Sequence, residues 1–80
     1  MNGNATFETH DLYLSAALTL HGFQLIDLRR NGNSNRGIFV FKDRADRPQY
    51  VQKFFSGQLQ GSLKGFSNTW ADLRNMLENL

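Results

Sequence analysis

The chain has 80 residues, of which 40% are hydrophobic and 12% aromatic, and this is the size and composition of one small globular domain. It contains no cysteine, which excludes disulfide bonds, thiolate metal sites and a thiol nucleophile. Nine Lys and Arg residues against seven Asp and Glu residues leave a formal net charge of +2, so bulk charge does not indicate a nucleic-acid-binding protein.

The first predicted element is a helix over residues 11–21, with the sequence DLYLSAALTLH. Thr9 precedes it as a candidate N-cap, and Gly22 follows its last turn, where helices commonly end. Because apolar residues cover most of its surface, we expect this helix to be the most buried element. Polar residues at every fourth position form one narrow stripe that we expect to face solvent: Asp11, Ser15 and Thr19.

Two strands are predicted next, over residues 23–30 (FQLIDLRR) and 37–42 (GIFVFK). Both runs are rich in β-branched, aromatic or other apolar residues, as strands are. The polar segment 31–36 between them contains the dipeptide Asn-Gly, which is a strong turn signal. An antiparallel β-hairpin is therefore the simplest interpretation of this part of the chain.

A second helix is predicted to begin near Asp46, a candidate N-cap, with Pro48 in its first turn and Gly57 after its end. We expect its apolar residues to face the core together: Tyr50, Val51, Phe54 and Phe55. The segment 58–64 that follows is compatible with a short third strand or with an irregular connector, and the sequence leaves both alternatives open.

A C-terminal helix is predicted from an N-cap at Ser67 to about residue 79, with Phe66 just before it. Its apolar residues form an inward stripe: Trp70, Leu73, Met76, Leu77 and Leu80. Together the elements predict an α+β fold in a single domain over residues 1–80, with residues 1–6 flexible. The predicted order is helix, antiparallel hairpin, helix, the short third strand if it forms, and C-terminal helix.

Several of these segments resemble a small family of uncharacterised domains of bacteria and their phages. They span most of the chain and are Asp11-Leu12-Tyr13-Leu14 with Ala16-Ala17, Gly22-Phe23, Ile38-Phe39-Val40-Phe41, Phe54-Phe55-Ser56-Gly57 and Phe66. The resemblance implies a compact α+β module in a bacterial or phage setting. It implies no catalytic residue, because the family has no assigned activity. The chain departs from the family pattern by a longer, Asn-rich hairpin tip.

No combination of residues predicts an enzyme or a metal site, and we expect neither catalysis nor a cofactor. Glu8, His10 and Asp11 are potential metal ligands, but helix capping explains them more simply. His21 lies at the far end of the same helix, where the helix dipole favours it. Ser15 lacks the neighbouring base that a nucleophilic serine needs. We expect a cytoplasmic protein, because the sequence shows no signal-peptide pattern and no membrane-spanning apolar run.

One polar cluster surrounds the predicted hairpin tip and comprises Arg29, Arg30, Asn31, Asn33, Asn35 and Arg36. Arg and Asn side chains contact phosphates and base edges, and a two-stranded ribbon can enter a major groove, so this cluster is a candidate nucleic-acid-binding site. A solvated loop and a protein contact are the alternatives.

From these observations we expect a small non-enzymatic binding module, with nucleic acid as the leading class of partner. The alternative is a protein-interaction or regulatory module, for example a phage-encoded inhibitor of a host protein. We expect a monomer or a weak dimer, because no surplus apolar stripe remains once the core is assigned.

Overall fold

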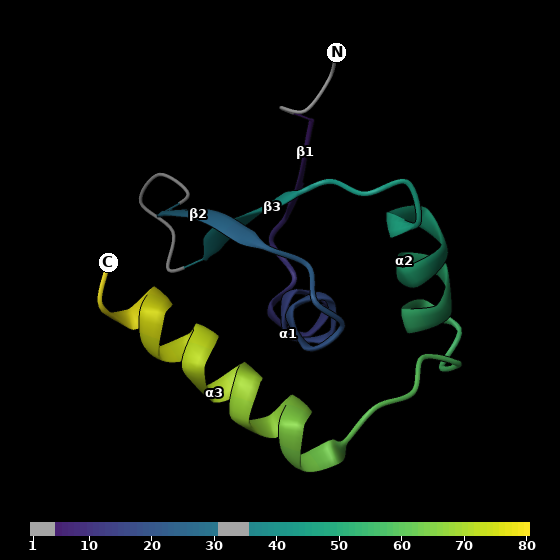
Figure 1. Ribbon diagram of the computed structural model, residues 1–80. Coiled ribbons are helices and arrows are strands. Elements are labelled where there is room, and N and C mark those ends of the chain that lie inside the picture. Colours follow the sequence, from purple (N-terminus) through teal and green to yellow (C-terminus); the bar gives the residue numbers. More distant parts are fainter. Residues whose placement is uncertain (1–4, 31–35) are drawn as a thin grey trace.

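The computed structural model describes residues 5–30 and 36–80, and they form an α+β fold (Figure 1). Its elements are, in chain order, β1 (Thr6–Thr9), α1 (Leu12–Leu20), β2 (Leu25–Arg30), β3 (Gly37–Lys42), α2 (Arg47–Phe55) and α3 (Leu63–Glu78). The predicted fold class is confirmed. Of the segment 1–6 that the sequence predicts to be flexible, residues 1–4 lie outside the described residues and Thr6 begins β1.

The strands form a three-stranded antiparallel sheet with the order β1-β3-β2, so β3 lies in the centre. The predicted hairpin is confirmed, with Arg30 opposite Gly37 at the ends of its strands. The pairing of β2 with β3 shifts between Leu25 and Asp27, which leaves Ile26 in a bulge. The sheet therefore curves at β2.

Strand β1 has no counterpart among the predicted elements. Its sequence, TFET, contains a single apolar residue, Phe7, and lacks the run of β-formers that marks a strand. The strand forms because β3 offers it a free edge, with Phe7 opposite Phe41 and Thr9 opposite Phe39. Residues 58–62, by contrast, form an irregular connector, so of the two alternatives for residues 58–64 the third strand is wrong.

Helix α1 lies at the centre of the fold, between the sheet and α3, with α2 at its side (Figure 1). Its residues Leu14–Leu18 are all buried, as expected for a helix that is packed on several faces. The predicted exposure of Ser15 is therefore wrong. Its Oγ donates a hydrogen bond of 2.8 Å to the backbone carbonyl of Asp11, which offsets most of the cost of burying the hydroxyl. The core around α1 consists of Leu14, Ala16, Leu18, Phe23, Phe39, Phe41 and Leu73.

Short-range hydrogen bonds set the ends of α1. Asp11 is the N-cap, since its carboxylate accepts a hydrogen bond of 3.0 Å from the backbone N–H of Leu14. Thr9, the predicted cap, instead accepts a hydrogen bond of 3.1 Å from the N–H of Asp11. Gly22 follows the helix with φ of 89°, a left-handed conformation that glycine adopts without strain.

Helix α3 begins earlier than predicted. Ser62 is its N-cap and accepts a hydrogen bond of 3.0 Å from the N–H of Gly65, so the predicted cap at Ser67 is wrong. The longer helix places Phe66 one turn before Trp70 on the inward face. Two other residues of the predicted stripe are about half exposed, because they are turned away from that face: Met76 and Leu80.

Helix α2 packs more loosely than the other helices. It begins with Pro48 in its first turn as predicted, and Gly57 follows its end with φ of 76°. None of its residues is fully buried. Phe55 is 66% exposed, so its predicted place in the core is wrong. Neighbouring residues in a helix point about 100° apart, and it is Phe54 that packs against the core.

Candidate functional site

Arg29, the first arginine of the predicted nucleic-acid-binding cluster, forms ion pairs within the protein. Its guanidinium nitrogens lie 2.8 Å from a carboxylate oxygen of Glu8 and 3.6 Å from one of Asp27. Glu8 on β1 and Asp27 on β2 both lie opposite Val40 on the central strand, so these charges share the outer face of the sheet. Two carboxylates therefore offset the charge of Arg29.

The other two arginines of the cluster have different surroundings. Arg30 donates a hydrogen bond of 3.1 Å to the backbone carbonyl of Leu80, at the end of the chain. Arg36 borders a depression at the start of α1, together with Tyr13 and its preceding residues. The structure thus directs Arg29, Arg30 and Arg36 to three separate places. Three residues of the cluster lie outside the described residues: Asn31, Asn33 and Asn35.

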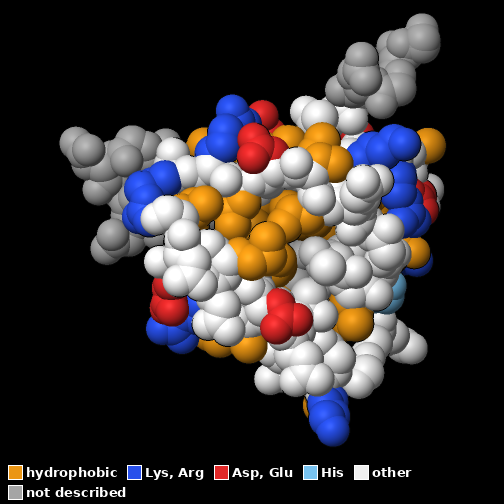
Figure 2. Space-filling model, turned by 60° about the vertical axis from the view of Figure 1, so that its left-hand side comes forward, with side chains coloured by type: hydrophobic (Ala, Val, Ile, Leu, Met, Phe, Trp, Pro, Cys, Tyr) orange, Lys and Arg blue, Asp and Glu red, His pale blue; other side chains and the backbone are white. Residues whose placement is uncertain are grey.

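The face of the molecule next to the hairpin is not uniformly basic. Figure 2 brings forward the side that carries the hairpin and the end of α3, and a hydrophobic area lies at its centre with charges of both signs around it. Exposed large hydrophobic residues occur in these elements at Ile26, Met76 and Leu80. Mixed charge around an apolar centre is typical of protein-contact surfaces rather than of DNA-binding ones.

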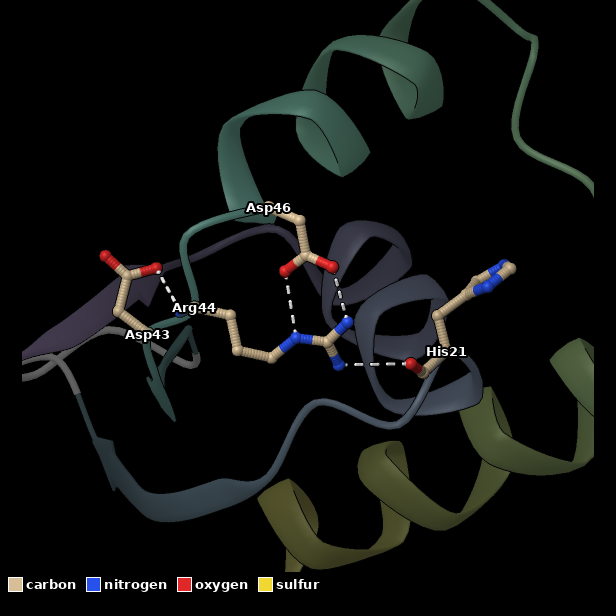
Figure 3. A network of polar contacts seen from close by, with 4 residues as sticks. All are labelled: His21, Asp43, Arg44 and Asp46. Carbon is tan, nitrogen blue, oxygen red and sulfur yellow. Dashed lines mark hydrogen bonds and ion pairs between the residues drawn. The ribbon is translucent and has the colours of Figure 1, made fainter.

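Arg44 connects the end of α1, the segment that leads into β2 and the start of α2, and Figure 3 shows its hydrogen bonds. Its guanidinium donates two hydrogen bonds to the Asp46 carboxylate, of 2.9 and 2.7 Å, and one of 3.4 Å to the backbone carbonyl of His21. The guanidinium carbon lies 3.9 Å from the centre of the Phe23 ring. Asp46 occupies the N-cap position of α2 as predicted, but its carboxylate binds Arg44 and makes no hydrogen bond to the helix. Arg44 thus fixes the geometry of three elements.

Two carboxyl groups in this loop have a lowered pKa. Hydrogen bonds from the Arg44 guanidinium lower the pKa of Asp46, and a hydrogen bond of 3.0 Å from Arg47 lowers the pKa of Asp43. Asp46 in turn raises the pKa of Arg44. Both carboxylates therefore stay charged down to lower pH than usual, which suits a structural ion pair and does not suit a general acid.

A cavity of about 230 Å³ lies where the ends of the three helices meet. Its walls come from the last turn of α1, the end of α2, the connector and the first turn of α3. Most of the lining is apolar. The lining residues are Ala17, Leu20, His21, Phe54, Gly57, Leu59, Gln60, Gly61, Ser62, Leu63 and Phe66.

The cavity continues into a polar depression of about 520 Å³ beside α2. The two share His21, Leu59 and Gln60, and we call them together the helix-end groove. Figure 3 shows the His21 ring turned away from Arg44, so only the backbone of His21 takes part in that network. The polar half is lined further by Asp46, Gln49, Tyr50, Lys53 and Gln58.

Large hydrophobic side chains at the rim of the groove are exposed to solvent. Leu63, in the first turn of α3, is 88% exposed although it also borders the cavity. Phe55 packs edge-on against Phe54, with ring centres 5.1 Å apart, and the Phe54 ring lines the cavity. Single exposed hydrophobic residues are common, but two beside one apolar cavity mark a surface suited to binding.

Sequence reasoning did not find this groove. Its apolar residues between Phe54 and Phe66 follow neither a helical nor a strand period, because they belong to the end of one helix, a connector and the start of the next. The available signal was Leu59 and Leu63, two leucines among polar residues that no predicted core required. The sequence cannot show that they meet Leu20, which is distant along the chain.

The potential metal ligands and the serine that the sequence raised have structural roles or no partners in the described part of the chain. Within residues 5–30 and 36–80, no three His, Asp or Glu side chains are grouped so as to hold a metal ion. Asp11 serves as a helix cap, and the Ser15 hydroxyl is buried against a backbone carbonyl. None of the described helices combines the length and the apolarity needed to cross a membrane.

The comparison with known proteins identifies the family of this chain, but no function is known for that family. The model of a family described as a domain of unknown function, DUF5659, matches residues 4–79. No curated protein and no solved structure matches the chain. The geometry of the molecule is therefore the basis for any functional argument.

Proposed function

Since the chain belongs to the DUF5659 family, whose function is unknown, we propose from its geometry that it is a small non-enzymatic binding module whose partner is another protein. The helix-end groove is the proposed binding surface. The observation that carries this proposal is the apolar cavity with Leu63 exposed at its rim and with Phe55 exposed beside the lining residue Phe54. Exposed hydrophobic side chains around a cavity gain free energy when a partner covers them.

The open shape of the groove favours a protein partner over a small molecule. Small-molecule sites usually have volumes of about 300 to 1,000 Å³ and enclose most of the ligand. The groove as a whole, with a polar depression of about 520 Å³ beside the cavity, falls within that range, but it is open at the surface and does not enclose a ligand. The apolar cavity alone has about 230 Å³. It matches one large apolar side chain, and a single anchor residue in a pocket is the usual centre of a protein interface.

Nucleic-acid binding, the leading hypothesis from the sequence, becomes the second candidate. What supports it is the composition of the hairpin tip. What weakens it is that Arg29 is paired with two carboxylates and Arg30 with the carbonyl of Leu80. These interactions compete with a phosphate for the guanidinium groups and so weaken its binding.

The proposed module is of bacterial or phage origin, as the family resemblance implies, and acts as a monomer or weak dimer. Asp27 accepts a hydrogen bond of 2.9 Å from the N–H of Leu28 on β2, which is an edge strand. This bond occupies a backbone donor that a second copy would need for strand pairing. Sheet extension through β2 is therefore disfavoured.

Selection of peptides from a random displayed library on the immobilised protein tests the proposal. The affinity of the leading peptide is then measured by fluorescence polarisation on the parent and on Leu63→Ser. Because Leu63 is 88% exposed, the substitution should leave the melting curve unchanged. We expect affinity to fall by about 10-fold or more, as expected when a buried leucine contact is lost.

Leu80→Ser is the matched control, because Leu80 is also an exposed leucine and lies at the far end of α3. Its affinity should stay within about 2-fold of the parent value. The proposal is wrong if the library yields no peptide, or if Leu63→Ser and Leu80→Ser weaken binding equally.

A further inference from the structure

We infer that the helix-end groove binds an acidic segment that carries one large apolar side chain, the side chain entering the cavity and the acidic residues lying over the two lysines beside it. This inference rests on the proposed function and specifies the chemistry of the partner. It follows from the distribution of charge around the groove.

Lys53 lines the groove, Lys64 follows a lining residue along the chain, and neither lysine has a partner of its own among the described residues. Lys53, in the last turn of α2, lines the polar half of the groove. Lys64 lies in the first turn of α3, next to Leu63 at the rim of the cavity. Neither lysine forms an ion pair with any residue that the structure describes.

These two lysines differ from most of the arginines of the protein, which are paired with carboxylates. Four arginines form ion pairs with carboxylates: Arg29, Arg44, Arg47 and Arg74. The carboxylate that borders the groove belongs to Asp46, and the two hydrogen bonds from Arg44 already occupy it. The groove therefore presents positive charge to a partner, because the carboxylate that lines it, that of Asp46, is paired with Arg44.

The start of α3 adds to the positive electrostatic potential around the groove. This helix has 16 residues, and its first turn contains no acidic side chain. The N-terminus of a helix carries a partial positive charge, which an acidic residue in the first turn normally offsets. The start of α3 lines the apolar cavity, Lys64 lies in that first turn, and Lys53 lines the adjoining polar depression. A ligand complementary to this arrangement is negative with an apolar centre.

The probe is a short fluorescein-labelled peptide of Glu and Asp residues with one central phenylalanine, and binding is followed by fluorescence polarisation. Replacing the phenylalanine with alanine should weaken binding by about 10- to 150-fold, the effect of losing one buried aromatic side chain. Replacing every acidic residue with Gln or Ser should remove the salt dependence and most of the affinity.

Variants of the protein locate the acidic contact. Lys53→Gln and Lys64→Gln should each weaken binding by about 1.5- to 5-fold, as expected for exposed ion pairs. Lys42→Gln is the matched control, because Lys42 on β3 is also exposed and unpaired among the described residues and lies away from the groove. It should leave the affinity unchanged.

The results separate this inference from the proposed function. If the uncharged phenylalanine peptide binds as well as the acidic one, the groove binds apolar side chains but the preference for acid is wrong. If the acidic peptide with alanine binds as well as that with phenylalanine, or if Lys42→Gln weakens binding as much as the groove variants, the inference is wrong. If neither these peptides nor the displayed library binds, the proposed function fails too.

Discussion

The two ends of this small protein are packed very differently. Where α1 meets the sheet, Leu18, Phe39 and Phe41 are fully buried, and hydrogen bonds to Asp11 close the start of α1. Where α2 runs through the connector into α3, none of the α2 residues is fully buried, a cavity remains open, and Phe55 and Leu63 face solvent. Both ends are rich in large apolar side chains.

The difference shows that apolar residues serve two purposes in this chain. At the sheet end they hold the fold together, because almost all of their surface is removed from water. At the groove end they contribute less to the free energy of folding than fully buried side chains of the same size, because much of their surface stays exposed. A surface that is unfavourable in the isolated protein is available to stabilise a complex.

The largest effect is expected from a matched pair of leucine substitutions. Leu18→Ala should lower the free energy of unfolding by about 3 to 5 kcal/mol, because it leaves a cavity in the packed core. Leu63→Ala should change it by less than about 0.5 kcal/mol, since that side chain is almost fully exposed. Urea denaturation followed by circular dichroism measures both. Equal losses would contradict the contrast between the two ends.

Trp70, between the two ends on α3, should show an intermediate effect. Its ring stacks on Tyr13 of α1, with centres 6.0 Å apart, and its Nε1 is buried without a hydrogen-bond partner among the described residues. Trp70→Ala should cost about 3 kcal/mol, the lower end for a core aromatic residue, because the side chain is only partly buried.

Trp70→Phe is the informative control for that residue. It keeps most of the apolar contact and removes an unpaired buried N–H group, which is itself costly. We expect the phenylalanine variant to lie within about 1 kcal/mol of the parent in the same urea experiment. A loss as large as that of the alanine variant would mean that the indole N–H has a partner that stabilises the fold.

A smaller effect should appear as a dependence of stability on pH in the loop that joins the two ends. The folded-state pKa values of Asp43 and Asp46 are lowered by Arg47 and Arg44. The stabilisation is therefore fully present above the unfolded carboxyl pKa of about 3.9, and it is lost as the pH falls through the lower folded-state values. The double variant Asp43→Asn with Asp46→Asn should lose less stability than the parent between about pH 5 and pH 2.

Asp72→Asn controls for the general effect of removing a carboxylate. Asp72 lies on α3 and forms no ion pair with the described residues. Urea denaturation at each pH should give this variant the same pH dependence as the parent. If it flattens the curve as much as the double variant does, the two loop carboxylates are not the cause.

The smallest effect is expected for nucleic acid at the hairpin. Because Arg29 and Arg30 are already engaged, we expect affinity for duplex DNA at 50 mM salt to be weaker than about 10⁻⁴ M. The triple variant Arg29→Ala, Arg30→Ala and Arg36→Ala should then behave like the parent in a polarisation titration. A slope of log affinity against log salt of about −2.7, or 0.9 × 3, that disappears in the triple variant would instead support the hairpin as the binding site.

The sequence predicted the elements that depend on near neighbours. Helix α1 carries its own capping residues and an apolar surface, and the β2–β3 hairpin combines two strand-forming runs with a turn signal. The start of α3 was misplaced because Ser62 and Ser67 are both good N-caps. Only the packing of Phe66 on the core decides between them.

By itself, then, the sequence determined the α+β class, the central helix, the hairpin, the position of α2 and the presence of α3, because capping and periodicity act over a few residues. The tertiary structure decided the pairing of β1 with β3, the burial of Ser15 and the pairing of Arg29 with Glu8. It also decided the helix-end groove, in which Leu20, Phe54 and Leu63 meet. Each of these results joins residues that are far apart along the chain, and no local pattern encodes such a contact.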